Sequence, residues 1–263
     1  MPFPDINPIA LQLGPIAIRW YGIAYLAAIA LGWFLLLRRA RRPESGWSGE
    51  QISDLIFYAA VGLILGGRVG YILFYNFADY LRQPWAIFAV WQGGMSFHGG
   101  LLGGIAACGW YARRNDRSFF AVTDLLAPVV PIGLFLGRVA NFVNGELWGA
   151  PTDLAWGVIF RGELAGGVPR HPSQLYEACL EGVVLFAVLW PLSRRPRRAG
   201  LLSAMLLALY GVFRCAVEFV REPDLQVGYL AGGWLTMGQA LSLPMVLAGL
   251  AIYVFCTRRQ PAP

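Results

Sequence analysis

Four polar residues fall on one face of an apolar segment near the C-terminal end of the chain. Tyr210, Arg214, Glu218 and Arg221 are spaced i, i+4, i+8 and i+11, so a helix over 200–220 places all four side chains on one face. A glutamate between two arginines can hold their guanidinium planes and partly offset the cost of burying them. The excess of arginine favours an anionic ligand, and an internal ion pair that fixes helix packing is the alternative.

A second polar cluster lies in the run GRVANFVNGELWG, residues 137–149. Arg138, Asn141 and Glu146 are expected to gather just beyond the end of an apolar segment. An asparagine amide and an arginine fork suit the oxygen atoms of a phosphate and of glycerol hydroxyls. Glycine-rich Asn-Gly turns also simply end helices, and composition alone does not decide between the two readings.

His98 stands at the start of a glycine-rich helix. Gly99 and Gly103, like Gly100 and Gly104, are spaced i, i+4, a pattern that lets membrane helices approach closely. His98 lies just before these glycines. It is either a hydrogen-bonding packing residue or a group that moves a proton.

A further polar run, HPSQLYE, begins at His171 and leads into an apolar segment. Pro172 suits a helix start, and Ser173 is expected to cap that helix. Glu177 and Glu181 lie one turn apart and either of them could pair with the arginines. With two histidines in the chain and no cysteine cluster, neither a metal site nor another cofactor is expected.

The composition determines the environment in which these residues must work. The chain has 263 residues, of which 57% are apolar and 14% charged, and its mean hydropathy is +0.54. A soluble domain carries about 25% charged residues, and a disordered chain would be far more polar. The composition therefore predicts a polytopic membrane protein.

The positive charge of the chain is arranged as in the cytoplasmic loops of membrane proteins. All 21 basic residues are arginine, and thirteen of them form four short clusters, each directly after a long apolar segment. This is the pattern of the positive-inside rule. A nucleic-acid surface would gather its charge on one polar domain, so no nucleic-acid partner is expected. The clusters lie within 38–42, 113–117, 194–198 and 258–259.

A membrane-spanning helix needs about 20 mostly apolar residues, and seven segments are predicted to span. With arginine clusters after the first, third, fifth and seventh, the N-terminus lies outside and the C-terminus in the cytoplasm. The sequence thus predicts an all-α fold and a single integral-membrane domain over residues 1–263. The predicted spans are roughly 17–37, 52–75, 97–112, 119–137, 175–192, 200–220 and 236–256.

Two features break the pattern of a simple bundle. Residues 141–174 are rich in glycine, proline and polar residues, which predicts an outer-side head segment with a short strand at 156–160. Arg68, Arg138 and Arg214 fall inside spans or at their outer ends, where an unpaired arginine costs at least about 2.5 kcal/mol. Three arginines near one depth favour a polar functional cavity over snorkelling or pairing within the bundle.

The sequence resembles the prolipoprotein diacylglyceryl transferases of bacterial inner membranes. The 13-residue run 137–149 matches the signature of that family without a departure, and the resemblance covers nearly the whole chain. It extends to Trp20-Tyr21-Gly22, to His98-Gly99-Gly100, to the run from His171 to Glu177, and to Tyr210 through Asp224.

This resemblance implies an activity, its partners and a location. A diacylglyceryl group would pass from phosphatidylglycerol to the lipobox cysteine of a prolipoprotein signal peptide, forming a thioether and releasing glycerol phosphate. The enzyme would lie among the lipids of the bacterial inner membrane, with its active site toward the outer (periplasmic) half. Because the substrate supplies the thiol nucleophile, no serine or cysteine nucleophile of the enzyme is needed.

The resemblance also implies roles, residue by residue. Arg138 and Arg214 would hold the phosphate, and His98 would be the base. These three are the expected catalytic residues. The expected substrate-binding residues are Tyr21, Asn141, Glu146, Gly149, Tyr210, Glu177, Glu218 and Arg221.

Three other functions compete with this reading. A transporter for a small anionic solute would also carry arginines in its bundle, but it needs a polar path to the cytoplasm, and the polar residues concentrate in the outer half. An intramembrane protease would need a Ser/His pair or paired aspartates within the spans, whereas Asp54 and Asp124 lie at cytoplasmic ends and are interpreted as helix-start residues. A purely structural scaffold would leave the arginines unexplained.

Overall fold

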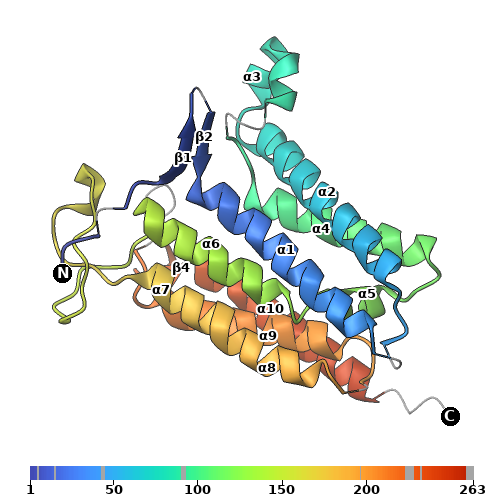
Figure 1. Ribbon diagram of the computed structural model, residues 1–263. Coiled ribbons are helices and arrows are strands. Elements are labelled where there is room, and N and C mark those ends of the chain that lie inside the picture. Colours follow the sequence, from blue (N-terminus) through green and yellow to red (C-terminus); the bar gives the residue numbers. More distant parts are fainter. Residues whose placement is uncertain are drawn as a thin grey trace. The chain divides into compact units, whose positions relative to one another are not determined.

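A computed structural model describes residues 1–4, 6–14, 16–42, 45–89, 93–195, 197–222, 228–231 and 233–258. The chain, drawn as a ribbon in Figure 1, divides into two compact units. Unit 1 comprises residues 1–32 and 124–263, and unit 2 comprises residues 33–123.

The described chain is mostly helical, as predicted. Its helices are α1 (Trp20–Ala40), α2 (Gly49–Phe74), α3 (Phe77–Arg82), η2 (Pro84–Phe88), α4 (Phe97–Arg114), α5 (Phe119–Leu126), α6 (Val130–Asn144), η4 (Glu163–Ala165), α7 (Ser173–Glu177), η5 (Ala178–Val184), α8 (Leu185–Leu192), α9 (Leu201–Glu218) and α10 (Met237–Arg258). Four short strands, which the all-α prediction did not include, are β1 (Ile9–Leu13), β2 (Ile16–Arg19), β3 (Tyr229–Ala231) and β4 (Leu235–Thr236).

Five helices in the described part of the chain are long and apolar enough to cross a membrane: α1, α2, the continuous stretch Ser173–Leu192, α9 and α10. A bent pair, α5 with α6, makes a sixth if it is one span. The third predicted span is a helix, α4, which ends on Arg113 and Arg114 and is not among these apolar helices.

The first predicted span begins later than expected. Residues 17–19 belong to strand β2, which pairs with β1 in an antiparallel hairpin, and helix α1 starts at Trp20. The turn contains Gly14 with φ +57°, a backbone conformation that glycine adopts without strain. The short apolar stretch before Trp20 therefore forms a strand in place of the first helical turn.

Glycines join α2 and α4 within unit 2. The predicted close approach is confirmed at Gly99 and Gly103, and α2 contributes glycines of its own to the seam, but the same expectation was wrong at Gly104, where a Cβ atom would have nothing within 4 Å. A Cβ atom at Gly62 would lie 2.6 Å from the Gly103 oxygen, and one at Gly70 would lie 2.8 Å from the Gly99 Cα. Backbone packs directly on backbone here, which explains the density of glycine in both helices.

The two neighbouring glycines of α4 give a matched test of this seam. A Cβ at Gly103 would overlap the Gly62 carbonyl group and lie 2.8 Å from the Gly66 Cα, whereas nothing lies within 4 Å of one at Gly104. We expect Gly103→Ala to destabilise the protein by about 1–3 kcal/mol through overpacking and Gly104→Ala to leave it unchanged. Thermal unfolding of both variants in detergent measures this, and equal unfolding midpoints would contradict the seam.

Arg68 holds a loop in place, contrary to the functional role that its depth suggested. It is buried in unit 2, its guanidinium group lies over the Tyr80 ring, and each of its five N–H groups finds a backbone acceptor. A guanidinium group satisfied in this way has no donor left for a ligand. The acceptors are the carbonyl oxygens of Ala86 (2.5 Å), Ile87 (2.9 Å), Ala89 (3.3 Å), Gly93 (2.6 Å) and Gly94 (3.1 Å).

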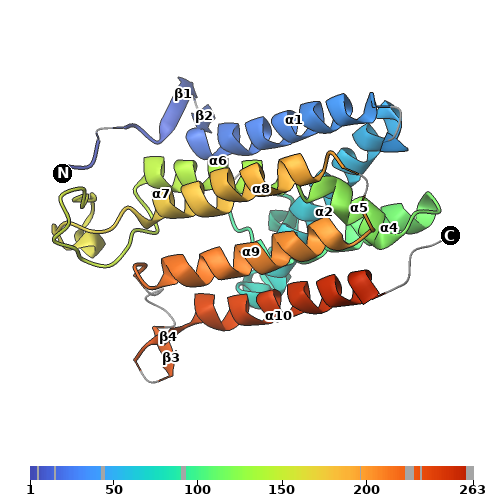
Figure 2. The ribbon, with the colours of Figure 1, turned by 90° about the horizontal axis from the view of Figure 1, so that it is seen from below.

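In unit 1, α8 and α10 lie along opposite sides of α9, and α6 packs on the stretch from α7 to α8 (Figure 2). Asp124 ties the start of α9 to this bundle. Its carboxylate accepts hydrogen bonds from the backbone N–H groups of Gly200 (2.8 Å) and Ser203 (2.7 Å) and from the Ser203 hydroxyl (2.6 Å). Asp124 is therefore a helix-start residue, but it caps α9 and not its own helix.

The head segment is shorter than predicted and has its own core. Residues 141–144 still belong to α6, and α7 begins at Ser173. Residues 156–160 form isolated bridges through Val158 and Ile159 in place of a regular strand. The core consists of Phe3, Val158, Phe160 and Ala165. Phe3 donates from its backbone N–H to the Ile159 oxygen (3.1 Å), so the start of the chain packs into the head.

Candidate functional site

Three arginines of unit 1 converge on one buried carboxylate. Glu177 is only 1% exposed, and its oxygens lie 3.0 Å from Arg138 Nε, 3.2 Å from Arg214 Nη1 and 3.5 Å from Arg221 Nη1. The arginines come from α6, from α9 and from the segment after α9, while Glu177 ends α7. One carboxylate thus holds together groups from three parts of the chain.

Two further glutamates complete this cluster. Glu181 is fully buried, with Oε2 3.6 Å from Arg138 Nη2. Glu218 pairs with Arg214 one turn earlier on α9. Three glutamates therefore face three arginines, so the excess of positive charge expected from the face of α9 is balanced by the glutamates of the neighbouring α7–η5 stretch. We call these six residues the ionic cluster: Arg138, Glu177, Glu181, Arg214, Glu218 and Arg221.

Local helix geometry brings these side chains together. Helix α6 continues to Asn144 and ends at Gly145, whose φ of +68° forms a left-handed cap. Arg138 and Asn141 therefore lie inside the helix, one turn apart on one face, and not beyond its end as predicted. Facing Arg138, residues 178–184 form a π-helix that carries Glu181. Such wide turns inside α-helices are frequent at functional sites.

A polar turn continues the site from the end of α6. The side-chain amides of Asn141 and Asn144 donate to Glu146 Oε1 at 2.8 Å and 3.2 Å. The Gln174 amide donates to the backbone oxygen of Glu146 at 2.6 Å. The Ser173 hydroxyl donates to the Leu147 oxygen at 3.0 Å, so it ties helix α7 to this turn and does not cap the helix as expected. Asn141 is thereby held on the side of α6 that also carries Arg138.

Two tyrosines lie near Arg138. Tyr21, in the first turn of α1, and Tyr210, on α9, both interact electrostatically with the Arg138 guanidinium. The Tyr21 hydroxyl is also 3.3 Å from that of Tyr25. Tyr210 is one turn before Arg214, so the structure brings the predicted face of α9 to the ionic cluster.

Gly149 is a junction where three backbone segments meet. Its N–H donates to the His171 oxygen at 2.9 Å, and it forms an antiparallel bridge with Arg221. A Cβ at this position would lie 2.6 Å from the His171 Cβ, so only glycine fits. The Arg170 side chain binds the Gly149 oxygen at 3.2 Å and Glu222 at 2.8 Å. The signature run is therefore fastened to the segment that carries Arg221.

The two histidines occupy different surroundings. His171 lies in the head, with Nδ1 3.2 Å from the Tyr176 hydroxyl, which accepts a hydrogen bond from Trp156 Nε1 at 2.7 Å. Burial lowers the pKa of His171, which favours its neutral ring. His98 belongs to unit 2 and is exposed in the first turn of α4, where the Ser96 hydroxyl accepts from the Gly99 N–H and caps the helix.

The structure thus groups ten of the eleven predicted site residues in unit 1 and leaves His98 in unit 2. Among the residues it describes, both ion pairs of Arg214 use Nη1. A planar guanidinium group also carries N–H donors on its other two nitrogens. In Arg214 these are Nε and Nη2, which are suited to hold a phosphate. The guanidinium group of Arg214 is thus fixed by carboxylates at one nitrogen and presents N–H donors at the others, which makes it a preorganised anion-binding group.

Sequence reasoning left Glu181 and Thr236 out of the predicted site. Thr236 donates to Glu218 at 2.8 Å. The sequence signal for Thr236 was its spacing from Gln239, because Thr-x-x-Gln before an apolar run is a capping box. At the start of α10 the backbone N–H of each of these two residues donates to the side chain of the other. Glu181 follows Glu177 by four residues, but only the fold shows that both meet Arg138.

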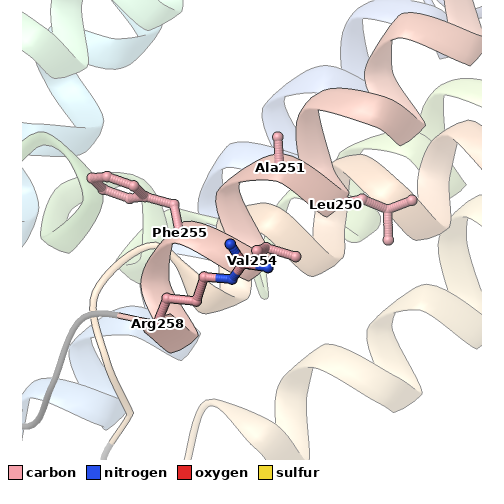
Figure 3. A pocket seen from close by; sticks show the side chains of 5 residues that line it. All are labelled: Leu250, Ala251, Val254, Phe255 and Arg258. Carbon is pink, nitrogen blue, oxygen red and sulfur yellow. The ribbon is translucent and has the colours of Figure 1, made fainter.

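An apolar pocket lies elsewhere on unit 1, along α10 (Figure 3). Its lining is Leu250, Ala251, Val254, Phe255 and Arg258. One cation among four apolar side chains offers no acid or base to pair with it. The pocket therefore does not compete with the ionic cluster as a candidate active site.

The helices and the ionic cluster define a multi-pass membrane protein with a buried ionic site in its helical bundle. Residues 8–255 match the model of a family described as prolipoprotein diacylglyceryl transferase. The chain belongs to this family.

Curated relatives resemble the chain over nearly its full length. A phosphatidylglycerol–prolipoprotein diacylglyceryl transferase of Ectopseudomonas mendocina is 53% identical, over 99% of this chain and 98% of the relative. The protein of that name from Pseudomonas aeruginosa PAO1 is also 53% identical, over 99% and 97%. One from Nitratidesulfovibrio vulgaris is 56% identical, over 94% of both chains.

Proposed function

We propose that this chain transfers the diacylglyceryl group of phosphatidylglycerol to the thiol of the lipobox cysteine of prolipoproteins. The observation that carries the proposal is the convergence of Arg138 and Arg214 on Glu177, in a chain of this family. Two guanidinium groups fixed by a common carboxylate suit a phosphodiester, because their geometry is set before the lipid arrives.

The reaction is a substitution at the glycerol carbon. The cysteine thiol loses its proton, its sulfur attacks the carbon, and the carbon–oxygen bond to phosphate breaks, so that glycerol phosphate leaves with the bonding electrons. A free thiol with a pKa of about 8.5 is only a few per cent thiolate at neutral pH, so a base is useful. Negative charge grows on the departing phosphate, where Arg138 and Arg214 stabilise it.

The remaining residues hold the substrate or the arginines. Tyr21, Asn141 and Glu146 shape the headgroup pocket, while Tyr210 and Gly149 border it. Glu177 and Glu218, with Arg221, organise the two phosphate-binding arginines. His98 serves as the base for the thiol.

In the membrane, the chain forms a single domain of seven spans, with α4 as the third. Its N-terminus is outside and its C-terminus is in the cytoplasm of a bacterial inner membrane. The arginine clusters after alternate spans support this orientation. The head segment and the ionic cluster then lie in the outer half, on the side from which a prolipoprotein presents its lipobox.

The test uses purified protein in detergent, phosphatidylglycerol, and a synthetic lipobox peptide with cysteine or with serine at the acceptor position. We expect mass spectrometry to detect diacylglyceryl addition to the cysteine peptide alone, with equal release of glycerol phosphate. We expect Arg138→Ala to abolish both, because the departing phosphate loses a charged donor worth about 10²–10³ in rate.

Folded protein that adds nothing to the cysteine peptide would contradict the proposal. Anion flux in liposomes would then test the transporter alternative. Addition that persists in Arg138→Ala would leave the transferase activity standing and contradict the role of that arginine.

A further inference from the structure

Glu218 of the ionic cluster is held from two sides. One carboxylate oxygen, Oε2, pairs with Arg214, and the other, Oε1, accepts a hydrogen bond of 2.8 Å from the Thr236 hydroxyl. Glu218 is 6% exposed and Thr236 is 3% exposed. With both oxygens engaged in a buried setting, the carboxylate has one orientation, and Arg214 takes its direction from it.

Thr236 is itself fixed by the start of α10. Its hydroxyl accepts from the Gln239 N–H at 3.2 Å, and its own N–H donates to Gln239 Oε1 at 3.1 Å. This capping box uses the acceptor side of the hydroxyl, which leaves its proton for Glu218. The first turn of α10 also favours a nearby carboxylate through the helix dipole.

The same turn approaches Glu218 so closely that no side chain fits between them. A Cβ atom at Gly238 would lie 2.5 Å from the carboxyl carbon of Glu218. The carboxylate therefore rests on the bare backbone of α10. The Thr236 hydroxyl and the backbone at Gly238 fix the position of the Glu218 carboxylate. The carboxylate in turn fixes the position of the Arg214 guanidinium group.

We propose that Thr236 and Gly238 are positioning residues, which aim Arg214 at the phosphate by holding Glu218. This inference rests on the proposed transfer reaction and extends it to the junction of β4 with α10. Arg214 is then directed by two helices, its own and α10.

The first experiment compares Thr236→Val, which keeps the shape but loses the hydroxyl, with Thr236→Ser, which keeps it. We expect Thr236→Val to lower kcat for phosphatidylglycerol about tenfold and to raise the inhibition constant of glycerol phosphate to a similar degree. A tenfold change corresponds to about 1.4 kcal/mol. Thr236→Ser should restore both values, because its hydroxyl can make the same bonds.

A double-mutant cycle distinguishes positioning from general support of the fold. In the Glu218→Ala background the oxygen that accepts the Thr236 hydrogen bond is gone, so we expect Thr236→Val to lower kcat by less than about twofold there. A full tenfold loss in that background would overturn the proposal, as would wild-type kcat in Thr236→Val.

A glycine pair on α10 provides a second test. Gly238→Ala and Gly249→Ala both force a methyl group against a neighbour, but at Gly249 the neighbours are the Ala204 oxygen and the Ala208 nitrogen, each at 2.7 Å, far along the helix from Glu218. We expect kcat to fall in Gly238→Ala and not in Gly249→Ala. Equal loss in both would overturn the positioning role, whereas wild-type protein that transfers nothing would overturn the proposed function and this inference with it.

Discussion

Replacing Arg214 by lysine is expected to lower kcat for diacylglyceryl transfer by about 10²–10³, the effect of removing one preorganised donor from a developing anion. Lysine keeps the charge but loses the planar fork. Glu177 and Glu218 both contact Arg214 through Nη1, so a single ammonium group would stay with these two carboxylates. It would have no second edge to offer the phosphate.

The measurement is peptide lipidation followed by mass spectrometry over a range of lipid concentrations. Arg195→Lys, an exposed change in the arginine cluster after α8, is the matched control and should keep wild-type kcat. Full activity in Arg214→Lys would show that charge alone suffices at this position.

Glu177→Gln is expected to destabilise the protein by about 3–5 kcal/mol, because removing one partner leaves buried charges uncompensated. Glu177 faces all three arginines of the ionic cluster, and with a neutral amide in its place Arg138, Arg214 and Arg221 would repel one another. Transfer should fall together with stability, since the arginines lose the group that holds them at a common distance.

Thermal unfolding in detergent and lipidation of the peptide, measured on the same preparations, test this expectation. Glu163→Gln, on the exposed surface of the head, removes a charge of the same kind and should change neither. An unfolding midpoint for Glu177→Gln equal to that of the wild type would mean that the arginines do not depend on this carboxylate.

The sequence predicted most helices because membrane spans obey strong rules of length and polarity. The glycine seam of α4 was also predictable, since its spacing has a direct steric meaning. The strand before Trp20 was not, because a short apolar stretch fits either a strand or a helix. The break between α5 and α6 was missed although Pro128 and Pro131 mark it, because the apolar run continues across both prolines.

The candidate site was predictable in its residue types and not in its pairing. The spacing of Arg214 and Glu218 along one helix follows from the helical period. The sequence allowed either Glu177 or Glu181 to pair with the arginines, but nothing in it states that both do so, or that Arg68 turns its donors toward backbone carbonyls. Such contacts depend on which helices become neighbours, which is a property of the whole fold.

The packing of the first residues into the head has a consequence for the order of events during synthesis. Met1 donates from its amino group to the oxygen of Gly157, 156 residues further along the chain, and Phe3 completes the apolar core there. At about 5–20 residues per second, the ribosome needs roughly 8–30 s between these two segments. The first residues therefore form their contacts with the head late in synthesis, and the apolar core of the head forms only after α6 has been synthesised.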